Sequence, residues 1–271
     1  MTVLGVGRGP SLLRSVTLSL DEMQYLQQTL GIDELPVVLN ATGRYDTAAE
    51  HDAAMAGAAA TLADRDLVDG DQVHPELAER LRVLYRPHWV LALRWYVAGQ
   101  VNRCCLAKGD DFEVVALRGP GSYALDEASH DLPGIVMAAL APADPLELSG
   151  MNAPTEDLVP ILDNAGDAAT TAARLTKVGN PVRDAQMLAS ALVQVNSHAE
   201  IVGVRHGDGS RDVADRHLAV YDTRHGRFLA STTTAEDGTK WTSFASGTTA
   251  RLRTALRDLI ESLPLRTEFP S

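Results

Sequence analysis

Hydrophobic and polar positions follow helix or strand spacing along most of the chain, and the elements they predict occur in the same order twice. The stretch VTLSLDEMQYLQQTLGI, residues 16–32, opens with alternating positions that predict a short strand. Ser19, with Glu22 three residues later, is a capping-box signature and predicts that a helix begins here. Gly31 follows the last apolar turn and predicts where that helix ends.

The rest of the first half predicts helices, a strand and a hairpin. In the stretch that Pro75 opens, three leucines share one helical face and Arg80 lies off it; these leucines are Leu77, Leu81 and Leu84. The predicted elements are a helix within 46–64, a helix within 75–86, a strand 89–97, a hairpin within 102–119 that turns at Lys108–Asp111, and a helix over 124–140 that breaks or restarts at Pro133.

The second half predicts the same order of elements. These are a capped helix within 153–166, an Ala-rich helix 167–179, an amphipathic helix within 184–197, a strand 199–207, a hairpin within 216–234 and a closing helix within 248–263. The apolar face of the amphipathic helix comprises Met187, Leu188, Ala191, Leu192 and Val195.

This repeated order indicates a duplication, because seven elements follow one another alike in both halves. It predicts an α/β fold of the α+β type, in which a pseudo-two-fold duplicated unit forms one central, mostly antiparallel sheet. Each half would supply three strands, and helices would cover one face and both ends. The predicted segments are a flexible N-terminal arm, 1–14, and two intimately packed halves, 15–145 and 146–271. Convergent patterning without duplication is the alternative.

Composition narrows the classes of partner. The 271 residues are 45% hydrophobic and 22% charged, which suffices for a sizeable core. A net charge of −12, without any Lys/Arg run longer than two, disfavours nucleic acid and anionic membrane surfaces. The N-terminus lacks a secretory-signal pattern, and the apolar segment 89–97 is short and interrupted by Arg94, so we expect a cytoplasmic protein without membrane insertion. Adjacent Cys104 and Cys105 predict neither a disulfide nor a zinc site.

Candidate chemistry concentrates in residues 199–229, where histidines alternate with acids. Pairing of 199–206 with 216–222 would bring His206 and His217 together, with Asp208 and Asp215 lining the loop, and such a set could hold a divalent metal or act in acid–base catalysis. In the alternative interpretation, glycines and aspartates form a polar turn that neighbouring arginines neutralise. We favour the turn, because ligands on a loop lack rigid support. The sequence contains no phosphate-binding loop, nucleophile elbow or HExxH motif.

An open sheet face is the second candidate. Strand alternation places Arg94 and Tyr96 on one face of the strand 89–97, and a partly open sheet would offer an amphipathic platform for a partner. The alternative is that both faces are core. The candidate partner-binding residues are Arg94, Tyr96, Arg205, Phe228, Ser231, Thr233 and Trp241.

The segment SVTLSLDEMQYLQQTLGIDELPVVL, residues 15–39, resembles the N-terminal signature of the EspG family, cytosolic chaperones of mycobacterial type VII (ESX) secretion. The resemblance extends through 75–97 and 216–231 to 250–263. It implies a central sheet with N- and C-terminal helical bundles, and no cofactor, metal or catalysis. It also implies binding of a PE–PPE heterodimer at the helical tip of the PPE subunit, which keeps the dimer soluble and helps target it to the secretion machinery.

By this resemblance, the central sheet and the C-terminal bundle contact the client. The link AGQVN, residues 98–102, is short here, whereas in some relatives the corresponding loop is long and helps bind the partner. Two alternatives remain at this point. One is a metal-dependent or acid–base enzyme built on the His206/His217 loop, and the other is self-association of the apolar patch into a homodimer when the client is absent.

Overall fold

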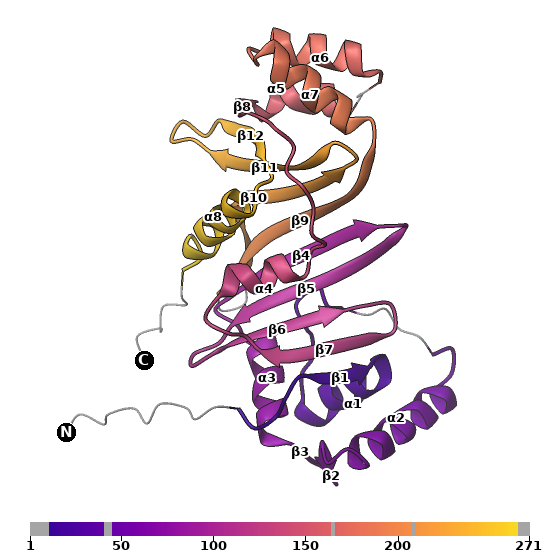
Figure 1. The fold of residues 1–271 in the computed structure, drawn as a ribbon. Coiled ribbons are helices and arrows are strands. Elements are labelled where there is room, and N and C mark those ends of the chain that lie inside the picture. The colour runs from indigo at the N-terminus through magenta and orange to yellow at the C-terminus, as the bar shows by residue number, and fades with distance from the viewer. Residues whose placement is uncertain (1–10, 41–44, 164–165, 208–209, 265–271) are drawn as a thin grey trace, which may run out of the picture.

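One large antiparallel sheet organises the computed structural model, which describes residues 11–40, 45–163, 166–207 and 210–264. Its strands lie in the order β1-β7-β6-β5-β4-β9-β10-β11-β12-β8, so β4 and β9 meet at the centre (Figure 1). The strands are β1 Val16–Ser19, β4 Trp89–Val97, β5 Gln100–Lys108, β6 Glu113–Arg118, β7 Ser122–Glu127, β8 Met151–Pro154, β9 Val195–His206, β10 Arg211–Thr223, β11 Gly226–Thr234 and β12 Lys240–Ser246. A separate two-stranded ladder pairs β2 Val68–Asp69 with β3 Gln72–Val73.

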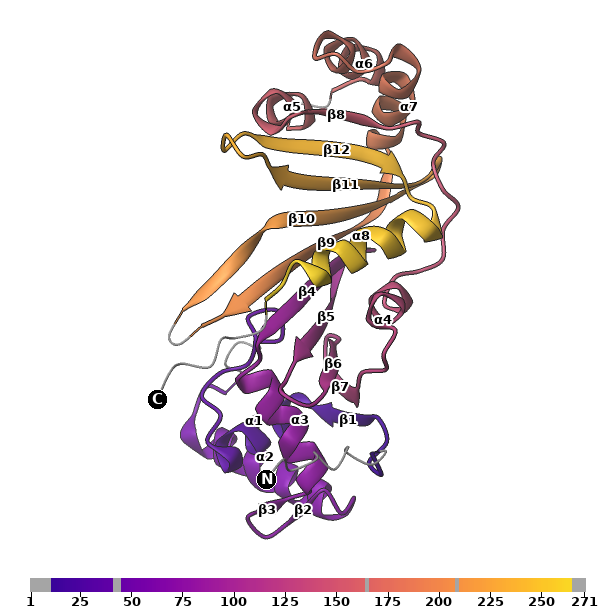
Figure 2. The same cartoon turned by 90° about the vertical axis from the view of Figure 1, so that its left-hand side faces the viewer.

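The helices form two bundles and a central pair. The first bundle comprises α1 Leu20–Leu30, α2 Ala48–Ala63 and α3 Pro75–Tyr85, and it lies at the β1 end of the sheet. The second bundle comprises α5 Thr155–Leu162, α6 Ala168–Lys177 and α7 Val182–Leu192, and it lies at the β8 end. The central pair, α4 Leu132–Ala138 and α8 Thr249–Glu261, packs near the middle of the sheet (Figure 2). No helix in the described segments has the length and apolarity that a bilayer crossing requires.

The order of elements repeats across the junction of β4 and β9. Apart from β2 and β3, each element from β1 to α4 has a counterpart of the same type, in the same order, from β8 to α8. The strand order is correspondingly mirrored, with β5 and β10, β6 and β11, β7 and β12, and β1 and β8 at equal distances from the centre. The predicted α+β fold with a mostly antiparallel sheet and two helical bundles is confirmed. The division at residue 145 stays a prediction.

Local signals explain where α1 begins and ends. Ser19 Oγ accepts a hydrogen bond from the Glu22 amide at 3.0 Å, and Glu22 Oε2 accepts one from the Ser19 amide at 2.7 Å. These two bonds satisfy amides that the first helical turn leaves without partners. Gly31 ends the helix with φ of 63°, a left-handed conformation that glycine adopts without steric cost. The predicted capping box and stop are therefore confirmed.

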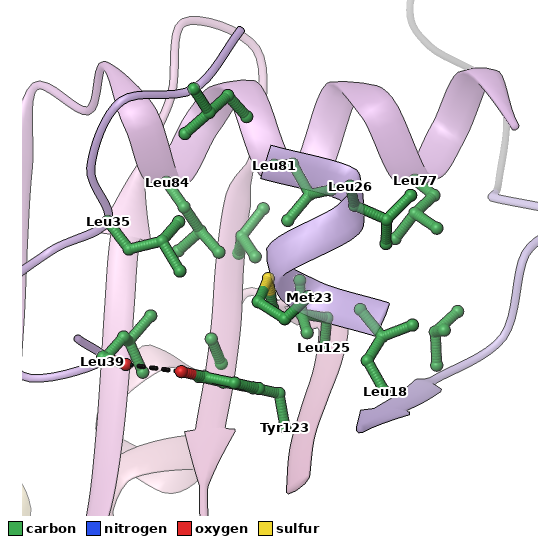
Figure 3. Packing of buried hydrophobic residues seen from close by; sticks show 14 of the residues in the cluster. Leu18, Met23, Leu26, Leu35, Leu39, Leu77, Leu81, Leu84, Tyr123 and Leu125 are labelled. Atoms are coloured by element: carbon green, nitrogen blue, oxygen red, sulfur yellow. Dashed lines mark hydrogen bonds between the residues drawn. The ribbon is translucent and has the colours of Figure 1, made fainter. Parts of the chain in front are cut away.

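The first core lies between the first bundle and the N-terminal half of the sheet. The predicted leucine face of α3 is buried there with Met23 and Leu26 of α1, above Leu18 and Leu125 of the sheet (Figure 3). Tyr123 adds a polar tie, because its hydroxyl donates to the carbonyl of Leu39 at 2.8 Å. Each such fully buried leucine contributes about 1.5–3 kcal/mol of hydrophobic stabilisation relative to exposure.

Two further cores show that the bundles and the central pair occupy opposite faces of the sheet. Trp89, Leu91 and Leu93 of β4 pack with leucines of α8 in the second core. The intervening residues of β4 point to the other face, where the first core lies. In the third core, Phe228 and Phe244 pack against α5, α6 and α7. Strand register places these two phenylalanines on the same face as Val90.

The sheet is wider than the sequence predicted. Each half supplies five strands and not three: β7, β8 and β12 were not predicted, and the short strand predicted before α1, which is β1, joins the same sheet. The helix predicted over 124–140 is wrong for its first part: residues up to Glu127 pair in β7 with both β1 and β6, and α4 begins only at Leu132. Alanine, leucine and glutamate favour a helix, but pairing with two neighbouring strands overrides that preference.

Helix boundaries in the second half also differ from the prediction. Helix α5 begins after Pro154, whose side chain makes no capping hydrogen bond, so the predicted cap is absent. Helix α7 ends at Leu192, and Val195 starts β9 with its side chain partly exposed instead of extending the helical face.

Helix α3 also holds the segment that precedes β1. Arg80 lies off the leucine face, as predicted, yet it is fully buried. Its guanidinium donates to the carbonyls of Leu13 and Arg14 and to the hydroxyl of Ser11. One turn earlier, Glu76 accepts hydrogen bonds from Ser11 Oγ and from the amides of Leu12 and Leu13. These bonds lower the pKa of Glu76 to about 2. Residues 1–10 of the predicted arm lie outside the described residues.

Candidate functional site

On the face that carries the two bundles, none of the helices in the described residues covers the middle of the sheet. We call this surface the central strip, and it consists of four residues of β4 and four of β9 in cross-strand pairs: Val90 with Val204, Ala92 with Val202, Arg94 with Glu200, and Tyr96 with His198. Apart from buried Val90, these side chains are half-buried or exposed. The strip therefore presents an amphipathic surface between the two bundles (Figure 2).

At one end, the strip continues as a row of aromatic rings towards the second bundle. The ring of Tyr96 stacks on that of His198 with centroids 4.5 Å apart, and His198 stacks on Tyr221 at 5.9 Å. Tyr221 stacks in turn on Phe228 at 4.8 Å, and Phe228 meets Phe244 edge-on at 6.3 Å. These contacts lie in the favoured range for aromatic pairs. The row thus joins the exposed strip directly to the third core.

Charge is concentrated halfway along the strip. Arg94 and Glu200 are exposed and face each other across β4 and β9, and the hydroxyl of Tyr96 donates to Glu200 Oε2 at 3.4 Å. Burial, together with the nearby Glu200 carboxylate, raises the pKa of Tyr221, so its phenol stays protonated. Among the described residues, Arg94 has no hydrogen-bond or ion-pair partner, which leaves its five donors available to a ligand.

At its other end, the strip forms the floor of a cavity of about 380 Å³. The wall opposite β9 is the segment Pro36–Val38, which belongs to the link between α1 and α2. His206 of β9 and Arg211 and Val213 of β10 also line the cavity. Most of the lining is aliphatic.

The predicted partner-binding residues do not share one face. Arg94 and Tyr96 lie on the central strip. Arg205, Ser231, Thr233 and Trp241 point to the opposite face, because they alternate with residues of the strip side along their strands. Phe228 is on the strip side but is completely buried in the third core. Sequence reasoning missed His198, Glu200 and Tyr221, since only the strand register shows that they adjoin Tyr96.

The predicted metal or acid–base cluster is not assembled. His206 of β9 pairs with Arg211, whereas His217 of β10 pairs with Val202 of β9. His217 therefore lies opposite a position four residues from His206 along β9, a separation of roughly 13 Å at the rise of a strand. The separation arises because β10 begins at Arg211, which pairs with His206, five residues earlier than the predicted pairing from residue 216. Asp215 lies in the register shift between Val213 and His217 and is exposed. Asp208 lies outside the described residues. Within those that are described, no group of three His, Cys, Asp or Glu residues is arranged to hold a metal.

A scan against models of protein families matches the EspG family over residues 19–258. The chain belongs to the EspG family. Among curated relatives, the ESX-3 secretion-associated protein EspG3 of Mycolicibacterium smegmatis is 27% identical over 94% of this chain and 89% of its own length. The ESX-1 secretion-associated protein EspG1 of the same species is 30% identical over 72% of this chain and 68% of its own length.

A solved structure supports the EspG fold. The chain described as the Mycobacterium tuberculosis type VII secretion system chaperone EspG5 in complex with the PE25–PPE41 dimer aligns with a TM-score of 0.77. The alignment covers 92% of this chain and 97% of that chain at 18% sequence identity. The EspG resemblance expected from the sequence is thus confirmed.

Proposed function

We propose that this EspG-family chain is an ESX secretion-associated chaperone that binds a PE–PPE heterodimer in the cytosol, keeps it soluble and aids its targeting. Family membership and the named PE25–PPE41 complex of EspG5 support this function. The observation that carries it is the uncovered central strip, an amphipathic surface flanked by helices on the same face of the sheet. The client-binding role is non-catalytic.

The chemistry of the strip suits a helical tip. Aromatic residues and arginine are enriched at interface hot spots, and Tyr96 and Arg94 stand side by side with a histidine and a carboxylate. An amphipathic helix end could bury apolar side chains on the strip and place polar groups against Arg94 and Glu200. The row of stacked rings would hold Tyr96 and His198 in place before binding, which lowers the entropic cost of ordering them.

The aromatic end of the strip, next to the second bundle, is the proposed centre of the client site. Of the seven predicted partner-binding residues, Arg94 and Tyr96 belong to this end of the strip. Arg205, Ser231, Thr233 and Trp241 would contribute only if the client also reached the opposite face.

Co-expression with PE–PPE pairs from the same genome, followed by size-exclusion chromatography, tests the proposal. A cognate dimer should co-elute with the wild-type chain, and Tyr96→Ala should weaken its binding about tenfold, as truncation of an aromatic hot spot does. Trp241→Ala is the matched control, because it truncates an exposed aromatic residue on the opposite face. If none of the dimers co-elutes, the chaperone function is refuted. If only Trp241→Ala releases the client, the client binds the opposite face.

The same chromatography tests the predicted homodimer of the client-free chain. Elution at twice the mass without a client, and at the mass of a 1:1 complex with one, would show that client and second copy compete for the same surface.

A further inference from the structure

The cavity at the first-bundle end of the central strip is built from segments that have no equal counterpart in the other half. The link between α1 and α2 runs from residue 31 to residue 47, whereas the link between α5 and α6 spans only 163–167. Strands β9 and β10 have 12 and 13 residues, against 9 each for β4 and β5. An ion pair between Arg211 and Glu34 ties the long hairpin to the long link. The cavity is therefore specific to this end of the strip.

The strip differs in chemistry between its two ends. The pairing of β4 with β9 is centred on Leu93 and Ile201, so positions equally distant from this centre can be compared. On one side, the four strip residues are aliphatic: Val90, Ala92, Val202 and Val204. On the other side, the four residues are charged or aromatic: Arg94, Tyr96, His198 and Glu200. A ligand that lies along the strip would therefore meet an apolar end and a polar end.

The rim of the cavity exposes apolar surface that nothing in the described structure covers. Val37 is 62% exposed and Val213 is 55% exposed, although both belong to the lining. The cavity volume of about 380 Å³ lies within the range of roughly 300–1,000 Å³ typical of pockets that bury small ligands. Polar side chains line the cavity only at its ends, with Arg94 and Glu200 at one and His206 and Arg211 at the other, so the aliphatic floor between them suits apolar groups.

We propose that this valine-lined cavity is a second docking point for the client dimer, filled by apolar side chains that flank the client segment bound at Tyr96. The proposal rests on the proposed function, and it assigns a client contact to the first half of the chain, in addition to the central sheet and second bundle. Continuity with the strip identifies the occupant, because one surface runs from Tyr96 past Arg94 to Val37. The charges at the boundary favour a client whose apolar side chains adjoin an acidic group that pairs with the free guanidinium of Arg94.

Binding measurements with rim variants test this second docking point. The probe is the PE–PPE dimer that co-elutes with the wild-type chain. The double variant Val37→Asp/Val213→Asp places two carboxylates at the rim, and because both valines are largely exposed, the fold should persist. We expect at least a tenfold increase in Kd. The matched control is Leu117→Asp, an exposed apolar residue of β6 on the opposite face, which should stay within twofold of wild type.

Photocrosslinking adds a readout of position. A benzophenone maleimide attached to Val37→Cys should crosslink to the client, and the same label on Leu117→Cys should not; native Cys104 and Cys105 are buried and escape labelling. The second docking point is overturned if the rim double variant binds within twofold of wild type while Tyr96→Ala still weakens binding, and the proposed function then stands. A crosslink to a second copy of the chain, and none to the client, would likewise overturn it. If wild type binds none of the dimers, both proposals fail.

Discussion

Replacing Arg80 with methionine should destabilise the protein by about 3 kcal/mol. Methionine retains much of the apolar stem but removes the guanidinium, which donates to Arg14 O at 3.1 Å, to Ser11 Oγ at 3.1 Å and to Leu13 O. A hydrogen bond from a charged group contributes about 1.5–3 kcal/mol, and the loss of a donor to the half-buried Leu13 carbonyl adds about 1 kcal/mol, the low end of the range for a buried group. The loss of desolvation cost for the cation offsets part of this sum.

Urea denaturation, followed by circular dichroism, measures the change in the free energy of unfolding, and thermal unfolding measures the change in Tm. The unfolding entropy of a 271-residue chain near 60 °C is ~0.6 kcal/mol/K, so 3 kcal/mol corresponds to a decrease in Tm of about 5 °C. Arg82→Met is the matched control, because Arg82 lies on the exposed side of the same helix and should change stability by less than ~0.5 kcal/mol. A loss below ~1 kcal/mol for Arg80→Met, or equal losses for both variants, would refute the reasoning that α3 anchors the segment before β1.

Three further predictions follow from other contacts. The pKa of Glu76 is lowered from 4.5 to about 2, so the stabilisation that its carboxylate provides is complete above pH 4.5 and is lost as the pH falls towards 2. Glu76→Gln should therefore flatten the dependence of stability on pH in that window by about 1 kcal/mol, after allowance for solvent screening. Measurement of the unfolding midpoint at a series of acidic pH values would show this change. A Cβ at Gly203 would lie 2.6 Å from Leu263 Cδ2, so Gly203→Val should cost about 1–3 kcal/mol, and thermal unfolding should show partial rescue in combination with Leu263→Ala. Burial raises the pKa of Cys104 to about 12 and that of Cys105 well above its ordinary value, so Ellman's reagent at pH 8 should label neither thiol until urea unfolds the chain; rapid labelling of the native protein would contradict the packing of β5.

Elements fixed by nearby residues could be predicted from the sequence, and elements fixed by distant ones could not. The start and end of α1 follow from Ser19, Glu22 and Gly31, which lie within the helix or beside it. Strand β7 was missed because its local composition favours a helix, and it is held in the sheet both by β6 beside it and by β1, which is more than 100 residues earlier. The burial of Arg80 could not be predicted for the same reason. Its position in α3 shows that it lies off the leucine face, but Leu13, whose carbonyl accepts its hydrogen bond, is 67 residues away in the sequence.

The surface proposed to bind the client could be located only from the pairing register of the strands. Alternation along β4 correctly puts Arg94 and Tyr96 on one face. The sequence did not reveal that Glu200 and His198 lie opposite them, or that Ser231 and Thr233 face the other way. A change of register by one residue exchanges the two faces of a strand. An error in register therefore assigns every candidate residue of that strand to the wrong face of the sheet.

The outermost strands of the sheet limit how far it can pair with another chain at its edges. A long free sheet edge exposes unpaired amides and carbonyls, which can template strand addition and aggregation. Here the wide sheet ends in β1 and β8, each with only four residues, and β8 finishes at Pro154, which lacks an amide hydrogen. The carbonyl of Thr17 in β1 is also occupied by Arg65. The molecule can therefore leave an amphipathic strip open at the centre of its sheet, while the short edge strands discourage strand addition from another copy.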